Sequence, residues 1–312
     1  MRKRTGILLL LLVSCTPRLE RGDWIPETYD ALQTLVSDKG NRGGYAVFDC
    51  DNTSILHDVT HTLMVYQIEN LRFAIAAEHG FTDGLQRTDF PMEGLGMTAA
   101  QMGASLREGY LSLKGRLDAG VPLEEIHASE EYLDWRARFL AFYKAIGRNY
   151  SYGELCLWEP SIAAGFPEEE LRALGRESIH HWLLQEKAWN EEWVSPDGRW
   201  TGVAEKGLVV TKEMKNLYRT LRKAGITPYI VSASPEWLVE ILACDPDRGF
   251  GLSPEEVFGV RFVETPDGSW DYEQGYHQPF KEGKVALIDS LIAPRYDGRD
   301  PVLAAGDSEG DV

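Results

Sequence analysis

This chain of 312 residues has few cysteines and few long apolar runs, and its net charge is negative. The four cysteines are too few for a disulfide scaffold, and those beyond Cys15 can form at most one disulfide. Beyond the first 15 residues, no run is apolar enough to cross a membrane. The formal net charge of −17 argues against nucleic-acid binding and against docking on anionic headgroups through charge. We therefore expect no nucleic-acid partner.

The first 15 residues carry the features of an export signal. A basic head, Arg2–Arg4, precedes the aliphatic run Ile7–Val13, and Ser14 and Cys15 close the segment. This ending resembles the bacterial lipobox, in which the cysteine is acylated, and the alternative is an ordinary secretory signal with a chance cysteine. We predict an extracytoplasmic protein, periplasmic or at the cell surface. A lipid on Cys15 would anchor it to a bacterial membrane. Loss of the signal with its three basic side chains would lower the formal charge from −17 to −20.

The rest of the chain divides by pattern into a short lead-in, an α/β core and a long insertion. Residues 16–43 are polar and predict a tether and a lead-in helix. Residues 44–54 and 207–312 alternate short apolar strands with helical patterns, which predicts a parallel sheet. Residues 55–206 follow the first strand and show mainly helical periodicity. The predicted fold class is therefore α/β, a Rossmann-like parallel sheet with a helical domain inserted after the first strand.

Acidic side chains follow both the first and the last strand of this predicted sheet. Asp49 and Asp51 follow the apolar run 45–48, while Asp307 and Asp311 follow the run 302–305. If these strands are neighbours, the four acids converge at the carboxyl edge, where open α/β sheets bind ligands. Clustered anions need a cation, and hard oxygen ligands select Mg²⁺. The sequence thus predicts a magnesium-dependent enzyme.

These positions suit phosphoryl transfer. The Asp49 carboxylate can attack phosphorus, and Asp51 can act first as the acid and then as the base. Ser232 stands at a strand end before a helix and can donate its hydroxyl to phosphate. Lys284, or alternatively Lys281, can supply the cation that pairs with the nucleophile and the phosphate.

The order of these motifs resembles that of the haloacid dehalogenase superfamily of phosphatases. The matching residues, in chain order, are Asp49, Asp51, Asn52, Thr53, Ser232, Lys284, Asp307 and Asp311. The resemblance implies that Asp49 is the nucleophile, Asp51 the acid and base, and Lys284 their cationic partner. It implies that Thr53 and Ser232 contact phosphate. It also implies that Mg²⁺ is held by Asp49, Asp307 and the Asp51 carbonyl, while Asp311 orients metal-bound water.

Within the superfamily, the segments 49–54 and 231–235 are similar to the branch that contains bacterial exported phosphorylcholine phosphatase, and also to phosphoserine phosphatases. The resemblance makes residues 55–206 a cap over the site. Family members usually continue past the last motif, whereas this chain stops at Val312. We expect the four central strands to assemble nonetheless.

The cap is rich in aromatic residues, which either pack a core or form a cage for a quaternary ammonium group. We predict a phosphomonoesterase acting on a small ester such as phosphorylcholine. The alternatives are a phosphoserine or broad-specificity acid phosphatase, and, in a different class, a non-catalytic surface lipoprotein derived from a phosphatase. The aromatic candidates are Trp135, Trp158, Trp182, Trp189, Trp193, Trp200, Tyr143, Tyr150 and Tyr152.

Overall fold

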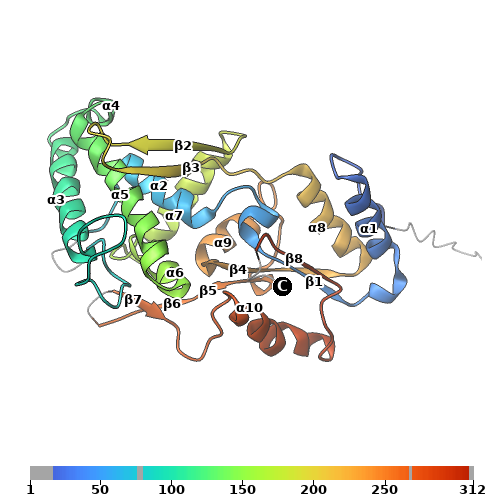
Figure 1. Ribbon diagram of the computed structural model, residues 1–312. Helices are drawn as coiled ribbons and strands as arrows, with labels where there is room; N and C mark the ends of the chain where they lie inside the picture. Colours follow the sequence, from blue (N-terminus) through green and yellow to red (C-terminus); the bar gives the residue numbers. More distant parts are fainter. Residues whose placement is uncertain (1–16, 76–79, 267–268, 309–312) are drawn as a thin grey trace, which may run out of the picture.

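The computed structural model describes residues 17–75, 80–266 and 269–308. Its centre is a four-stranded parallel sheet in the order β5–β4–β1–β8 (Figure 1). The strands are β1 (Tyr45–Phe48), β4 (Thr227–Pro235), β5 (Val257–Val260) and β8 (Leu303–Ala305). The predicted α/β fold class with a parallel sheet is confirmed. The predicted signal, Cys15 and Asp311 lie outside the described residues.

Strands β1 and β8 lie side by side although they come from the two ends of the described chain. Ala46 pairs with Leu303 and Phe48 with Ala305, in parallel register. The Asp49 amide then donates to the Ala305 carbonyl at 2.9 Å, which continues the pairing one residue past β1. The acids that follow the two strands therefore emerge at the same sheet edge.

Helices cover both faces of the sheet, as the wholly apolar β1 requires. Ala46 and Phe48 belong to the larger apolar cluster, while Tyr45 and Val47 belong to a second cluster on the opposite face. The helices of the core, in chain order, are α1 (Pro26–Ser37), α8 (Lys212–Ala224), α9 (Glu236–Ala243) and α10 (Glu282–Leu287). In Figure 1, α1 and α8 lie above the sheet and α10 below it.

Helix α8 begins and ends where the sequence predicts. The Thr211 side chain accepts from the Met214 amide, and Gly225 terminates the helix in the left-handed region at φ 81°. Helix α1 packs against α8. The segment before α1 also packs, because Leu19 is buried and its amide donates to the Gln33 side chain. Within residues 17–43, the predicted lead-in helix is present, and the expected tether is held against the core from Leu19 onward.

The insertion between β1 and β4 is mainly helical, and in Figure 1 it forms the left half of the molecule. Its helices are α2 (Val59–Asn70), α3 (Ala99–Asp118), α4 (Leu123–His127), α5 (Glu130–Asn149), α6 (Tyr152–Ser161) and α7 (Glu168–Leu183). It also contains an antiparallel hairpin, β2 (Trp189–Val194) and β3 (Thr201–Lys206), which the helical reading of residues 55–206 did not include. The hairpin packs against α5 and α2.

A second hairpin, β6 (Phe262–Glu264) and β7 (Trp270–Tyr272), follows β5 and approaches α6 (Figure 1). Short helical turns complete the fold at Lys39–Asn41, Cys50–Ser54, Pro254–Glu256, Ile288–Ile292 and Ala293–Tyr296. In the described part of the chain, no helix combines the length and the apolar character that a bilayer crossing needs.

Candidate active site

A tight turn directly after β1 places the first two acids. Residues Cys50–Ser54 form a tight loop with non-helical backbone at Asp51 and Asn52, and Asn52 takes φ 53°. Asparagine tolerates this left-handed conformation better than most residues. The turn is held by Ser54, whose hydroxyl donates to the Asp49 carbonyl at 2.6 Å, and by His57, whose amide donates to the Asn52 side chain at 3.1 Å.

Asp49 and Lys284 form a buried ion pair. Lys284 Nζ lies 2.9 Å from Asp49 Oδ1, and the two side chains are 9% and 10% exposed. Lys284 reaches this point from α10, where the chain turns very tightly. A Cβ on Gly283 would lie 1.9 Å from the Gln278 carbonyl oxygen, so only glycine fits before the lysine. The sequence expectation that Lys284 pairs with the nucleophile candidate agrees with this contact.

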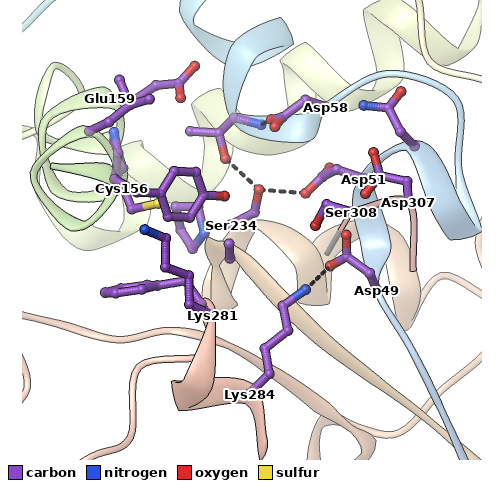
Figure 2. A pocket seen from close by; sticks show the side chains of 18 of the residues that line it. Asp49, Asp51, Asp58, Cys156, Glu159, Ser234, Lys281, Lys284, Asp307 and Ser308 are labelled. Atoms are coloured by element: carbon purple, nitrogen blue, oxygen red, sulfur yellow. Dashed lines mark hydrogen bonds and ion pairs between the residues drawn. The ribbon is translucent and has the colours of Figure 1, made fainter. Parts of the chain in front are cut away.

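Asp51 is held by a set of hydroxyl and amide donors (Figure 2). Its Oδ2 accepts from Ser234 Oγ at 2.7 Å, the bond that Figure 2 draws. The same oxygen accepts from Ser232 Oγ at 3.2 Å. Its Oδ1 accepts from the Val59 amide at 2.8 Å. Burial raises the pKa of Asp51 to about 8, and the nearby Asp58 carboxylate adds to the rise. A carboxyl group that holds its proton at neutral pH can act as a general acid.

A cavity of about 350 Å³ lies between these core residues and the cap helices. In Figure 2, Asp49, Asp51, Asp307 and Ser308 gather on one side and Glu159, Cys156 and Lys281 on the other. The remaining lining residues are Asn52, Asp58, Thr60, Tyr143, Tyr152, Leu155, Pro160, Ala233, Ser234, Pro235, Phe280 and Lys284. The cavity thus has an acidic side formed by the core and an opposite side formed largely by α5 and α6.

Glu159 is the buried acid of the opposite side. Its Oε1 atom is buried and has no hydrogen-bond partner among the described residues. The nearest cationic candidate is His61, whose Nδ1 lies 3.7 Å away. Burial lowers the pKa of His61 to about 4, and burial raises the pKa of Glu159 well above its ordinary value. Burial therefore favours the neutral form of both groups, and a cation bound in the cavity would favour the ionised form of Glu159.

The acids on the core side of the cavity fit a hard divalent cation. Asp49 and Asp307 line the same wall, and the five lining acids exceed the two lining lysines. Across the described residues, no three side chains from His, Cys, Asp and Glu form a metal-binding cluster. The predicted ligand set has only two carboxylates plus the Asp51 carbonyl, and these oxygens are the type that Mg²⁺ accepts.

The structure brings together Asp49, Asp51, Lys284 and Asp307, while the two predicted phosphate contacts, Thr53 and Ser232, do not line the cavity. Ser232 is fully buried, donates to Asp51, and does not line the cavity, whereas Ser234 does. Thr53 does not line the cavity either, and its hydroxyl is buried without a hydrogen-bond partner in the described segments. Cys50 is fully buried, as expected for a packing role.

Most of the tryptophans proposed for a cage pack the interior. Trp135, Trp158, Trp182, Trp193 and Trp200 are all buried. Of the nine aromatic candidates, only Tyr143 and Tyr152 line the cavity. The sequence reasoning did not single out Asp58, Ser234, Glu159 or Phe280 for the site, because their proximity arises from contacts between distant segments.

The sheet order, the helical insertion after β1 and the acids at the sheet edge are consistent with the haloacid dehalogenase fold. The chain is similar to the solved structure of a conserved, functionally unknown protein from Anaerococcus prevotii, with a TM-score of 0.80 and 26% sequence identity. The match covers 95% of this chain and 84% of that protein's chain. No protein-family model matches the chain.

Among proteins with a named activity, the chain is similar to phosphorylcholine phosphatase from Pseudomonas aeruginosa. The two are 24% identical over 256 residues, which is 82% of this chain and 59% of that enzyme. The chain thus spans less than two thirds of this relative's length. The similarity supports the resemblance to haloacid dehalogenase phosphatases and suggests a hydrolase acting on phosphate esters.

Proposed function

We propose that the protein is a Mg²⁺-dependent phosphomonoesterase that forms an aspartyl-phosphate on Asp49. The observation that carries the proposal is the buried Lys284–Asp49 pair, 2.9 Å apart, on a cavity wall shared with Asp51 and Asp307. A non-catalytic descendant of a phosphatase would be under no pressure to keep this set. The name of the Pseudomonas relative points in the same direction.

The residues divide the reaction into two displacements. An Asp49 oxygen attacks phosphorus, the ester P–O bond breaks, and the departing oxygen takes the proton of Asp51. The Asp51 carboxylate then removes a proton from water as the water oxygen attacks the phosphoryl group, which releases phosphate and restores Asp49. Lys284 fixes the orientation of Asp49 and stabilises negative charge on the phosphoryl oxygens.

Asp49, Asp307 and the Asp51 carbonyl would hold Mg²⁺. The ion would neutralise charge on the phosphoryl group. Ser234 is better placed than Ser232 to face a bound ester, because it lines the cavity while it donates to Asp51.

Phosphorylcholine is the substrate that the opposite side of the cavity favours. Glu159 offers a buried carboxyl group without a hydrogen-bond partner among the described residues, and Tyr143 and Tyr152 offer aromatic rings. A quaternary ammonium gains up to about 2 kcal/mol from a desolvated aromatic face. Its positive charge would also favour the ionised form of Glu159. Phosphoserine is the second candidate, because Lys281 also lines the cavity and its ammonium can pair with a substrate carboxylate.

Hydrolysis of para-nitrophenyl phosphate by the purified protein tests the proposed reaction. Turnover should require Mg²⁺ and disappear in Asp49→Asn. A panel of phosphorylcholine, phosphoethanolamine and phosphoserine then ranks the substrates. Failure of the folded protein to hydrolyse any ester would favour the non-catalytic alternative, while a preference for phosphoserine would overturn only the choline assignment.

We also propose that the protein is exported and held at a membrane by lipid on Cys15. The support is the order of basic residues, aliphatic run and cysteine at the start of the chain. Labelled fatty acid should enter the full chain and not Cys15→Ala. Equal labelling of both, or none of either, would overturn the anchor.

A further inference from the structure

The core segment 269–281, which contains β7 and the connection to α10, contacts the first turn of α6. The Tyr272 hydroxyl donates to the Gly153 carbonyl at 2.5 Å. The Phe280 ring packs against Tyr272 on one side and Tyr152 on the other, with ring centroids 5.8 and 6.1 Å apart. Tyr152 and Phe280 both line the cavity. One wall of the cavity is therefore built jointly by the cap and by this core segment.

The segment is also bonded to Arg261, the residue that follows β5. The Gln278 side chain accepts from the Arg261 amide at 3.0 Å and donates to the Arg261 carbonyl at 3.2 Å. Arg261 in turn pairs with Glu236, at the start of α9, at 2.9 Å. The segment thus connects the end of β5 with α6, and its last residues lead directly into α10, which carries Lys284.

Lys281 joins the same wall under backbone strain. Its φ of 50° lies in a region that non-glycine residues adopt rarely, and its ammonium lies 5.6 Å from the centre of the Tyr152 ring. Strained residues persist where the surrounding contacts fix them, and they are common at ligand sites. The strain is explained if the turn must present Phe280 to Tyr152 while it delivers Lys284 to Asp49.

We propose that Tyr272 is a positioning residue, which holds the first turn of α6 so that Tyr152 and Phe280 form the leaving-group wall of the cavity. The inference rests on the proposed function, since it assigns this wall to the group that leaves phosphorus. Tyr272 does not line the cavity, so it acts through Gly153 and Phe280. Its loss should weaken binding of the leaving group without disturbing Asp49 or Lys284.

The test compares Tyr272→Phe with Tyr276→Phe in the full chain. Each change removes one hydroxyl from the same segment, but the Tyr276 hydroxyl contacts only core residues, the Gly259 carbonyl at 3.1 Å and Glu236 Oε2 at 3.4 Å, among its described hydrogen bonds. For the ester that the unmodified protein hydrolyses best, Tyr272→Phe should raise KM about fivefold, the equivalent of one net hydrogen bond, and leave kcat within about twofold. Tyr276→Phe should change neither.

Hydrogen exchange gives a readout that needs no catalysis. Amides of residues 152–156 should exchange faster in Tyr272→Phe than in Tyr276→Phe. Equal KM and equal exchange in the two variants would overturn the positioning role, as would a fall in kcat at constant KM. If the unmodified protein hydrolyses no ester, the proposed function fails, and the exchange comparison alone then decides whether Tyr272 holds α6.

Discussion

Lys284 Nζ lies 2.9 Å from Asp49 Oδ1 although the two residues are 235 positions apart in the chain. We predict that Lys284→Met lowers kcat/KM by about 100- to 1000-fold, the usual loss when one charge-stabilising group is removed. Lys281→Met is the matched control, because Lys281 lines the same cavity but is exposed. Steady-state kinetics with para-nitrophenyl phosphate checks both, and equal losses would contradict a special role for Lys284.

Asp51→Asn should affect esters according to their leaving groups. The variant keeps the shape of the side chain and loses the proton that the proposal gives to the departing oxygen. Formation of the phosphoenzyme from phosphorylcholine, whose alkoxide is a poor leaving group, should slow about 100- to 10,000-fold, while formation from para-nitrophenyl phosphate should slow far less. Single-turnover measurements separate the two esters. A uniform loss would show that Asp51 does not protonate the leaving group.

Stability without divalent cations should fall as pH rises. Burial raises the pKa of Asp51 to about 8, so the folded state holds a proton that the unfolded state releases near pH 4. Between these values the folded state binds more protons, and the free energy of unfolding should fall by about 1.4 kcal/mol per pH unit for each such group. Urea titrations with EDTA at pH 5 to 8 measure the slope.

Glu159 should contribute to the same slope, because burial raises its pKa as well. Glu159→Gln should flatten the pH dependence of the unfolding free energy. An unchanged slope in this variant would mean that Glu159 is already ionised in the folded protein, and so would contradict the neutral Glu159–His61 pair.

Glu159→Gln also tests the choline assignment. The KM for phosphorylcholine should rise about tenfold, because roughly 1.4 kcal/mol of cation binding is lost, and the KM for para-nitrophenyl phosphate should hardly change. Glu168→Gln, an exposed acid at the start of α7, is the control and should leave both values unchanged. Equal changes for the two esters would remove Glu159 from cation recognition.

The sheet and its ligand edge were predictable because the signals are local. Short apolar runs that end in acids, the Thr211 cap and the Gly225 stop all act within a few residues, and each one corresponds to an element boundary in the structure. The neighbouring placement of β1 and β8 was a condition of the sequence argument, and the parallel pairing in the structure meets it.

The cap side of the site could not be predicted, because its residues meet only through packing. Glu159 and His61 are on different helices, and the Phe280–Tyr152 contact joins the core to α6. The sequence also cannot tell which of Ser232 and Ser234 reaches the cavity. They are two residues apart on one strand, and such residues lie on the same face. Only the structure shows that Ser234 reaches the cavity while Ser232 stays buried behind it.

The most direct test of the account is rapid acid quenching of Asp51→Asn with para-nitrophenyl phosphate and Mg²⁺. Because loss of the base slows water attack, the phosphoryl group should accumulate on Asp49. Its formation should release a burst of about one nitrophenol per active site. Mass spectrometry should find the phosphoryl group on the peptide that contains Asp49, and Asp49→Asn should show none. Continued hydrolysis with no burst and no label on that peptide would contradict covalent catalysis by Asp49.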